Sequence, residues 1–191
     1  ALASRVCCNM NRLFLLILIF AISSCSSVPL STMARMSTFD AQDFAALNPD
    51  ELRVKVFLPA GFRLNTGASR MGIDMISSSG QHQTVFELRE DSVQSIEVSK
   101  GLFSEPDQAN SYLLRLSPSS RAKFNELQLF VSKATVDDMS IRVVPKLASR
   151  PESATSVTVS IELQLSKSKG FFTLVDSAQI ALPEVGRSEE S

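Results

Sequence analysis

Residues 157–165 read Val157-Thr-Val-Ser-Ile-Glu-Leu-Gln-Leu165, an unbroken alternation of apolar and polar side chains. Successive side chains of a β-strand point to opposite faces of a sheet, so this period of two predicts a strand with one buried face. Residues 171–181 are the expected partner, because the loop Ser166-Lys-Ser-Lys-Gly170 between them has the composition of a hairpin. The C-terminal part of the chain is therefore expected to form an antiparallel hairpin.

The same period of two occurs upstream, in residues 52–58, and Pro59-Ala-Gly61 ends that run. Further strands are expected at 71–76, 84–89, 93–98, 112–116 and 141–144. The segment Ser-Ser-Ser-Gly80-Gln should be the hairpin loop between the first two of these, and residues 147–155 should be a loop.

Two short helices are predicted from their first residues. Asp40 is an N-cap with a second carboxylate, Asp43, at the third helical position, and this helix should end at about Leu47. Ser117-Pro118 gives an N-cap followed by proline at the first helical position, and apolar residues at helical spacing extend to about Thr135. The expected fold is mainly β (α+β), an antiparallel sheet or β-sandwich with about two short helices.

An apolar run without a charge follows Arg12 and ends in Ile22-Ser23-Ser24-Cys25. A membrane-spanning helix needs about 20 apolar residues, so this shorter run fits the apolar part of a secretory signal. Met10-Asn11-Arg12 would make a compact basic start for such a signal, which makes Met10 a candidate initiator.

The tetrad Ile22-Ser23-Ser24-Cys25 in this context resembles the lipobox of bacterial lipoproteins. The resemblance implies that residues 1–24 are a signal peptide cleaved between Ser24 and Cys25. It also implies that Cys25 carries diacylglycerol through a thioether and that the new amino terminus receives a further acyl chain such as palmitate. In enterobacterial sorting an Asp after the cysteine retains the protein at the inner membrane; residue 26 is Ser, which favours the outer membrane, facing the periplasm. The alternatives are an ordinary signal peptide cleaved elsewhere and a buried apolar helix of a cytoplasmic protein.

The rest of the chain divides into three expected parts. Residues 25–35 should be a lipidated tether, because residues 26–34 lack apolar periodicity. Residues 36–183 should form a single β-rich domain, and residues 184–191 a mobile tail.

Charge and cysteine content exclude several classes of function. Loss of Arg5 and Arg12 with the leader takes the 19 basic residues to 17 against 20 acidic ones, a net charge of −3. Without a basic excess or a basic run, nucleic acid is not an expected partner. The three cysteines are Cys7, Cys8 and Cys25, so the domain has no disulfide, thiol nucleophile or thiolate metal site.

No constellation of catalytic residues is apparent in the domain. The single histidine, His82, falls in a polar loop and is expected to be solvated, and no G-x-S-x-G motif is present to supply a nucleophile. The acidic pairs Glu90-Asp91 and Asp137-Asp138 are expected in solvated turns, with neighbouring side chains pointing apart. No metal-binding, phosphate-binding or dinucleotide motif occurs, so no cofactor is expected.

These patterns favour a membrane-anchored periplasmic lipoprotein that acts without catalysis, as a binding, scaffold or envelope-assembly accessory protein. Its partner would be an envelope protein bound through a sheet edge or exposed loops. The alternatives are a periplasmic hydrolase that uses His82 and a carrier of lipid or lipoprotein. Cys25 is the only residue to which the sequence assigns a chemical role.

Overall fold

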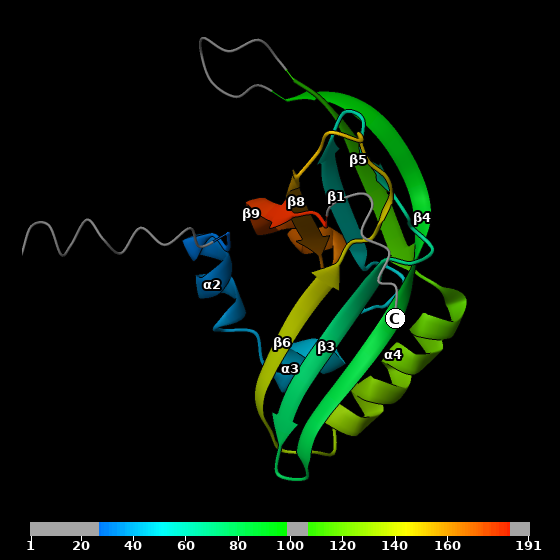
Figure 1. Ribbon diagram of the computed structural model, residues 1–191. Helices are drawn as coiled ribbons and strands as arrows, with labels where there is room; N and C mark the ends of the chain where they lie inside the picture. Colours follow the sequence, from blue (N-terminus) through cyan, green and yellow to red (C-terminus); the bar gives the residue numbers. More distant parts are fainter. Residues whose placement is uncertain (1–26, 99–106, 184–191) are drawn as a thin grey trace, which may run out of the picture.

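The computed structural model describes residues 27–98 and 107–183. The strands are β1 Arg53–Pro59, β2 Arg63–Leu64, β3 Arg70–Ser77, β4 Gly80–Val98, β5 Asp107–Leu116, β6 Val136–Val144, β7 Leu147–Ser149, β8 Ser156–Gln164 and β9 Phe171–Ala181. The helices are α2 Leu30–Met36, α3 Ala41–Ala45, α4 Pro118–Val131 and the 3₁₀ turn η1 Lys167–Lys169. Seven antiparallel strands form one curled sheet in the order β6-β3-β4-β5-β1-β8-β9 (Figure 1). The mainly β, antiparallel fold class predicted from the sequence is confirmed.

Strand β4 joins the two halves of this sheet. Its first half, up to Glu87, pairs with β3, and its second half, from Leu88, pairs with β5. The register shifts between Glu90 and Ser92, so Asp91 is the extra residue of a bulge, which bends a strand and increases its twist. Two separate strands, 84–89 and 93–98, were expected here; the structure has one strand of 19 residues that changes partner along its length.

Helix α4 covers the edge of β4 that β5 leaves free. The backbone N–H of Ser117 donates to the carbonyl of Glu87 at 3.0 Å, and the Glu87 N–H donates to Ser120 Oγ at 2.7 Å. The Lys123 ammonium donates to the Val85 carbonyl at 3.3 Å. The first turns of α4 thus hydrogen-bond to the strand edge as a neighbouring strand would.

A Ser120→Ala substitution should therefore destabilise the protein by about 1–3 kcal/mol, because the Glu87 N–H loses its acceptor. Ser120 is 3% exposed, so water is poorly placed to replace the hydroxyl. Urea unfolding would measure the change. Ser119→Ala, one position earlier on the exposed side of the same turn, should change stability by less than about 0.5 kcal/mol; equal losses for the two variants would contradict the edge-covering role.

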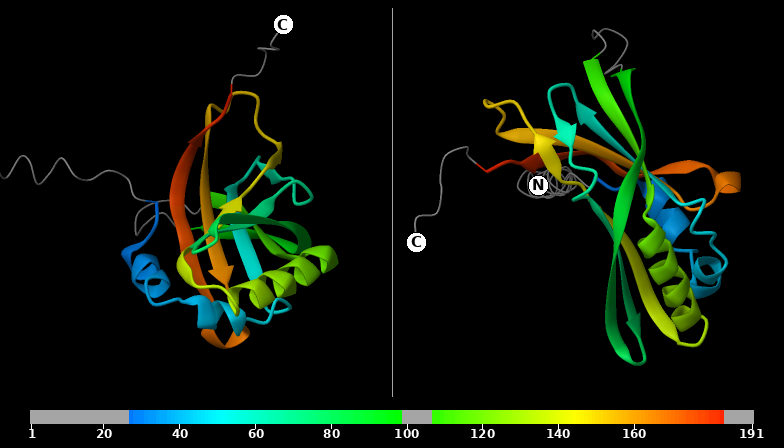
Figure 2. Two further views of the ribbon diagram at one scale, coloured as in Figure 1. Left: turned by 90° about the horizontal axis from the view of Figure 1, so that it is seen from below. Right: turned by 90° about the vertical axis from the view of Figure 1, so that its right-hand side faces the viewer.

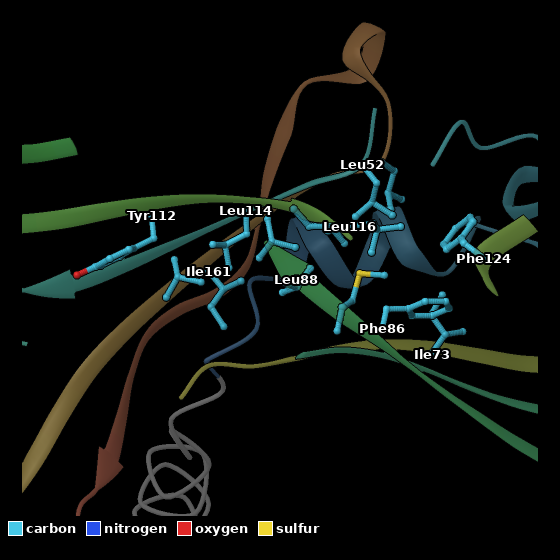
Figure 3. Close-up of a cluster of buried hydrophobic side chains, with 14 of the residues drawn as sticks. Leu52, Ile73, Phe86, Leu88, Tyr112, Leu114, Leu116, Phe124 and Ile161 are labelled. Atoms are coloured by element: carbon cyan, nitrogen blue, oxygen red, sulfur yellow. The ribbon is translucent and has the colours of Figure 1, made fainter. Parts of the chain in front are cut away.

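The core lies on the face of the sheet against which α3 and α4 pack. Strict alternation places the apolar residues of β1 and β8 on this face, as the sequence predicted. The rings of Phe44 in α3, Phe86 in β4 and Phe124 in α4 meet at its centre, with centroid distances from Phe124 of 4.9 and 5.5 Å. Figure 3 shows Phe124 and Phe86 beside Ile73 at one end of the cluster.

Several boundaries differ from the sequence predictions; strand β5, for example, begins at Asp107 and not at 112, since its first residues pair with the end of β4. Helix α4 ends at Val131, before the predicted Thr135, because the chain then turns to meet the β3–β4 hairpin, where Ser78 N–H donates to the Thr135 carbonyl at 3.3 Å. Strand β6 begins at Val136, ahead of the predicted 141, since its first residues pair with the end of β3. Residues 147–149, predicted as loop, form β7 and pair with β2.

Candidate functional site

The chain is bound to the sheet from the first described residue. The predicted attachment residue Cys25 and the cleavage position after Ser24 lie outside the described residues, as does the predicted mobile tail 184–191. The Ser27 carbonyl accepts a hydrogen bond of 2.6 Å from the N–H of Asp176 in β9. Two residues of chain span at most about 7 Å, so a lipid on Cys25 would be attached close to the edge of β9.

Helix α2 holds the following residues against β9. Thr32 is 3% exposed, and its hydroxyl donates to the carbonyl of Thr173. The guanidinium of Arg35 lies 4.5 Å from the centre of the Phe172 ring and donates to the Lys169 carbonyl at 3.4 Å. The prediction that residues 26–34 are an irregular tether is therefore wrong for the residues of α2. Contacts with β9 hold this part of the chain in place, and such contacts produce no periodic pattern in the sequence.

A pocket of about 440 Å³ opens between α2, α3 and the end of β8. Met36, Phe39 and Leu47 are among its apolar lining residues, and its charged lining residues are Arg35, Asp43, Glu51 and Lys169. The Glu51 carboxylate accepts the Lys167 backbone N–H at 2.9 Å, and the Asp43 carboxylate accepts the Asp40 N–H at 3.4 Å. These two carboxylates are engaged in holding the backbone, so the pocket is better suited to binding a small amphipathic group than to acid–base chemistry.

His82 lies inside β4 and not in the loop where the sequence placed it. Its Nε2 is 2.9 Å from the Ser79 hydroxyl in the hairpin, and its ring centre is 4.7 Å from that of Phe130 in α4. No carboxylate of the described residues hydrogen-bonds to this ring. Sequence analysis did not single out Ser79, although a serine three residues before a histidine across a turn is a detectable pattern.

The two acidic pairs lie in strands, which corrects their expected placement in turns. Asp91, at the bulge of β4, lies 3.5 Å from Arg53 Nε and 3.4 Å from Arg115 Nε. These arginines are directly opposite each other on β1 and β5, where like charges repel, so the carboxylate has a structural role between them. Asp137 and Asp138 lie in β6 beside a second pocket of about 240 Å³. Among the residues that the structure describes, no cluster of acidic, His or Cys side chains could hold a metal ion.

The second half of β4 has a free edge. Residues 92–98 pair with β5 on one side, and no strand within the described ranges pairs with their other side. Val93 and Val98 on this segment are 43% and 39% exposed. Figure 1 shows this half of β4 continuing past the end of β3. Its open N–H and C=O groups could receive an added strand.

Within residues 27–98 and 107–183, no helix is long and apolar enough to span a membrane. Comparison of the chain with protein-family models, with curated proteins and with solved structures gave no match.

Proposed function

We propose that this protein is a lipid-anchored protein of the bacterial envelope that binds a partner protein without catalysing a reaction. It would be attached through Cys25, with the outer membrane, facing the periplasm, as its location. The observation that carries the binding role is the free edge of β4 at residues 92–98. The partner would be an envelope protein that presents an extended segment.

The contacts of the N-terminal segment are compatible with the proposed processing. Among residues 27–98 and 107–183, Ser27 makes the first contact to the sheet, so cleavage before Cys25 would remove none of the interactions described above. A thioether-linked diacylglycerol and an amide-linked chain would together give a durable anchor, because one acyl chain alone binds a membrane only marginally.

Strand addition is the form of binding that the β4 edge favours. Backbone groups of an added strand would pair with residues 92–98 and give affinity, while Val93 and Val98 offer exposed apolar contacts on either side of the strand. Of the two ends of the sheet, β9 is hydrogen-bonded to Ser27 and Thr32, and β6 begins beside the α2–α3 connection. These contacts occupy part of each terminal strand, whereas no described residue hydrogen-bonds to the outer backbone edge of residues 92–98.

A photo-crosslinking amino acid at Val93 should capture a specific envelope protein in intact cells. Val85 is the matched control, since it is in the same strand and 42% exposed, but α4 covers that part of the edge. Mass spectrometry of the adducts would identify the partner. The same adducts from both positions, or none from Val93, would contradict binding at this edge.

A lipid carrier is the second candidate function, because the 440 Å³ pocket has an apolar wall and opens at the C-terminal end of α2, at Arg35 and Met36. A bound lipid in the native mass spectrum of the purified protein would support it. The hydrolase alternative would depend on the Ser79–His82 pair alone.

A further inference from the structure

Helix α2 carries exposed apolar side chains on one side, while its one buried side chain is a threonine. Leu30 is 83% exposed and Met33 is 52% exposed, whereas Thr32 is 3% exposed. Leu30, Met33 and Ala34 are spaced three and four residues apart, so they share one side of the helix. This is the reverse of the arrangement in a helix that packs against a core, where the apolar side faces inward.

The contacts of α2 with β9 fix the direction in which this apolar side points. The Thr32 hydroxyl binds β9, and the Arg35 guanidinium binds Lys169, which lies just before β9 in the chain. The Ser27 carbonyl, just before α2 begins, also binds β9. Turning Leu30 and Met33 inward would break these hydrogen bonds. The apolar side is therefore a fixed outward surface of the domain.

The position of this surface in the chain indicates what covers it. Isolated exposed apolar residues are common and need no partner. Here, however, Leu30 is only five positions after Cys25, and Ser27, which is hydrogen-bonded to β9, is two positions after the proposed attachment site. The Cα atom of Cys25 lies within about 7 Å of the Ser27 Cα atom, so a diacylglycerol on the Cys25 sulfur would begin near Ser27 and bring the start of α2 close to the lipid surface.

We propose that the outer side of α2, with Leu30 and Met33, inserts into the membrane surface and forms a second contact beside the lipid anchor. This inference depends on the proposed acylation of Cys25. The domain would then have a defined orientation, with the α2 side against the lipid. Helix α4 lies on the opposite side of the molecule (Figures 1 and 2) and would face away from the membrane.

Fluorescent labelling of single cysteines tests this orientation on the mature, full-length lipoprotein. An acylated Cys25 has its sulfur in a thioether, and Cys7 and Cys8 leave with the leader, so a Met33→Cys variant has one reactive thiol. Leu129→Cys is the matched control, because Leu129 is also an exposed apolar helix residue, 62% exposed, but on α4. Both variants would carry an environment-sensitive dye in vesicles of phosphatidylethanolamine and phosphatidylglycerol.

The dye at position 33 should emit at shorter wavelength in vesicles. A spin label placed shallowly in the lipid should also quench it at least about two-fold more strongly than the dye at position 129, because interfacial helices insert about 5–10 Å. Equal quenching at the two positions, with the protein floating with the vesicles, would overturn the membrane contact of α2 and leave the anchor intact. An intact mass without acyl chains would overturn both. A blue shift without vesicles that grows with protein concentration would show that a second copy covers α2, and would also overturn the proposal.

Discussion

Replacement of Cys25 by alanine should abolish acylation and detach the mature domain from the membrane. The thiol is the only group in the predicted lipobox that can form the thioether, and residues 26–191 contain no other cysteine. Each methylene group of an acyl chain contributes about 0.8 kcal/mol to membrane binding, so loss of all chains removes essentially the whole anchoring free energy. The α2 surface alone would leave only weak, reversible binding.

Metabolic incorporation of an alkyne-tagged palmitate, followed by intact mass measurement, would check this result. Wild-type protein should carry the tag and lack residues 1–24, and the Cys25→Ala variant should carry no tag. A Cys7→Ala, Cys8→Ala double variant is the control and should be processed as wild type, because both positions leave with the leader. Tagged Cys25→Ala protein, or wild-type protein that retains the leader, would contradict the proposed anchor.

A Phe124→Ala substitution should destabilise the domain by about 3–5 kcal/mol, a large fraction of the 5–15 kcal/mol typical of natural domains. Phe124 is fully buried, and its ring contacts Phe44 and Phe86, so truncation leaves a cavity where α3, α4 and β4 meet. The two aromatic contacts are also lost, each worth about 0.5–1.5 kcal/mol beyond buried area. Loss of this ring should loosen α4 from the edge of β4.

Thermal unfolding followed by circular dichroism would measure the effect, and a fall of about 6–20 °C in Tm is expected for a domain of this size. Leu129→Ala on the exposed side of the same helix is the control and should shift Tm by no more than about 2 °C. A Phe124→Ala protein with near wild-type Tm would mean that α4 is not anchored through this cluster.

Patterns that depend only on residues close together in the chain led to correct predictions. The alternation in β1 and β8 survives in the structure because each strand buries one face, and the strand predicted at 171–181 coincides with β9. The caps at Asp40 and Ser117 were also identified, because a capping side chain bonds to backbone groups two or three residues away: Asp40 accepts the N–H groups of Gln42 and Asp43, and Ser117 accepts that of Ser120.

Elements that depend on distant partners were missed or misplaced. The sequence predicts two strands in place of β4 because the acidic pair Glu90-Asp91 suggests a turn, whereas the structure continues the strand through this pair with Asp91 in a bulge. Helix α2 lacks the pattern that identifies a packed helix, because its buried residue is a threonine while Leu30 and Met33 are exposed. In both segments, hydrogen bonds to residues far away in the chain set the structure.

Local patterns predict the fold class and the candidate anchor, Cys25, because alternation, capping and the lipobox-like tetrad each involve only residues that are close in the chain. Which strand edge is free and which way α2 faces can be seen only in the three-dimensional arrangement of the strands and helices. Strand order and the covering of edges by α2 and α4 arise from contacts between residues such as Thr32 and Thr173, or Glu87 and Ser120, that are far apart in the chain. Contacts of this kind produce no periodic pattern of apolar and polar residues in the sequence. The proposed binding edge of β4 and the proposed membrane contact of α2 both depend on them.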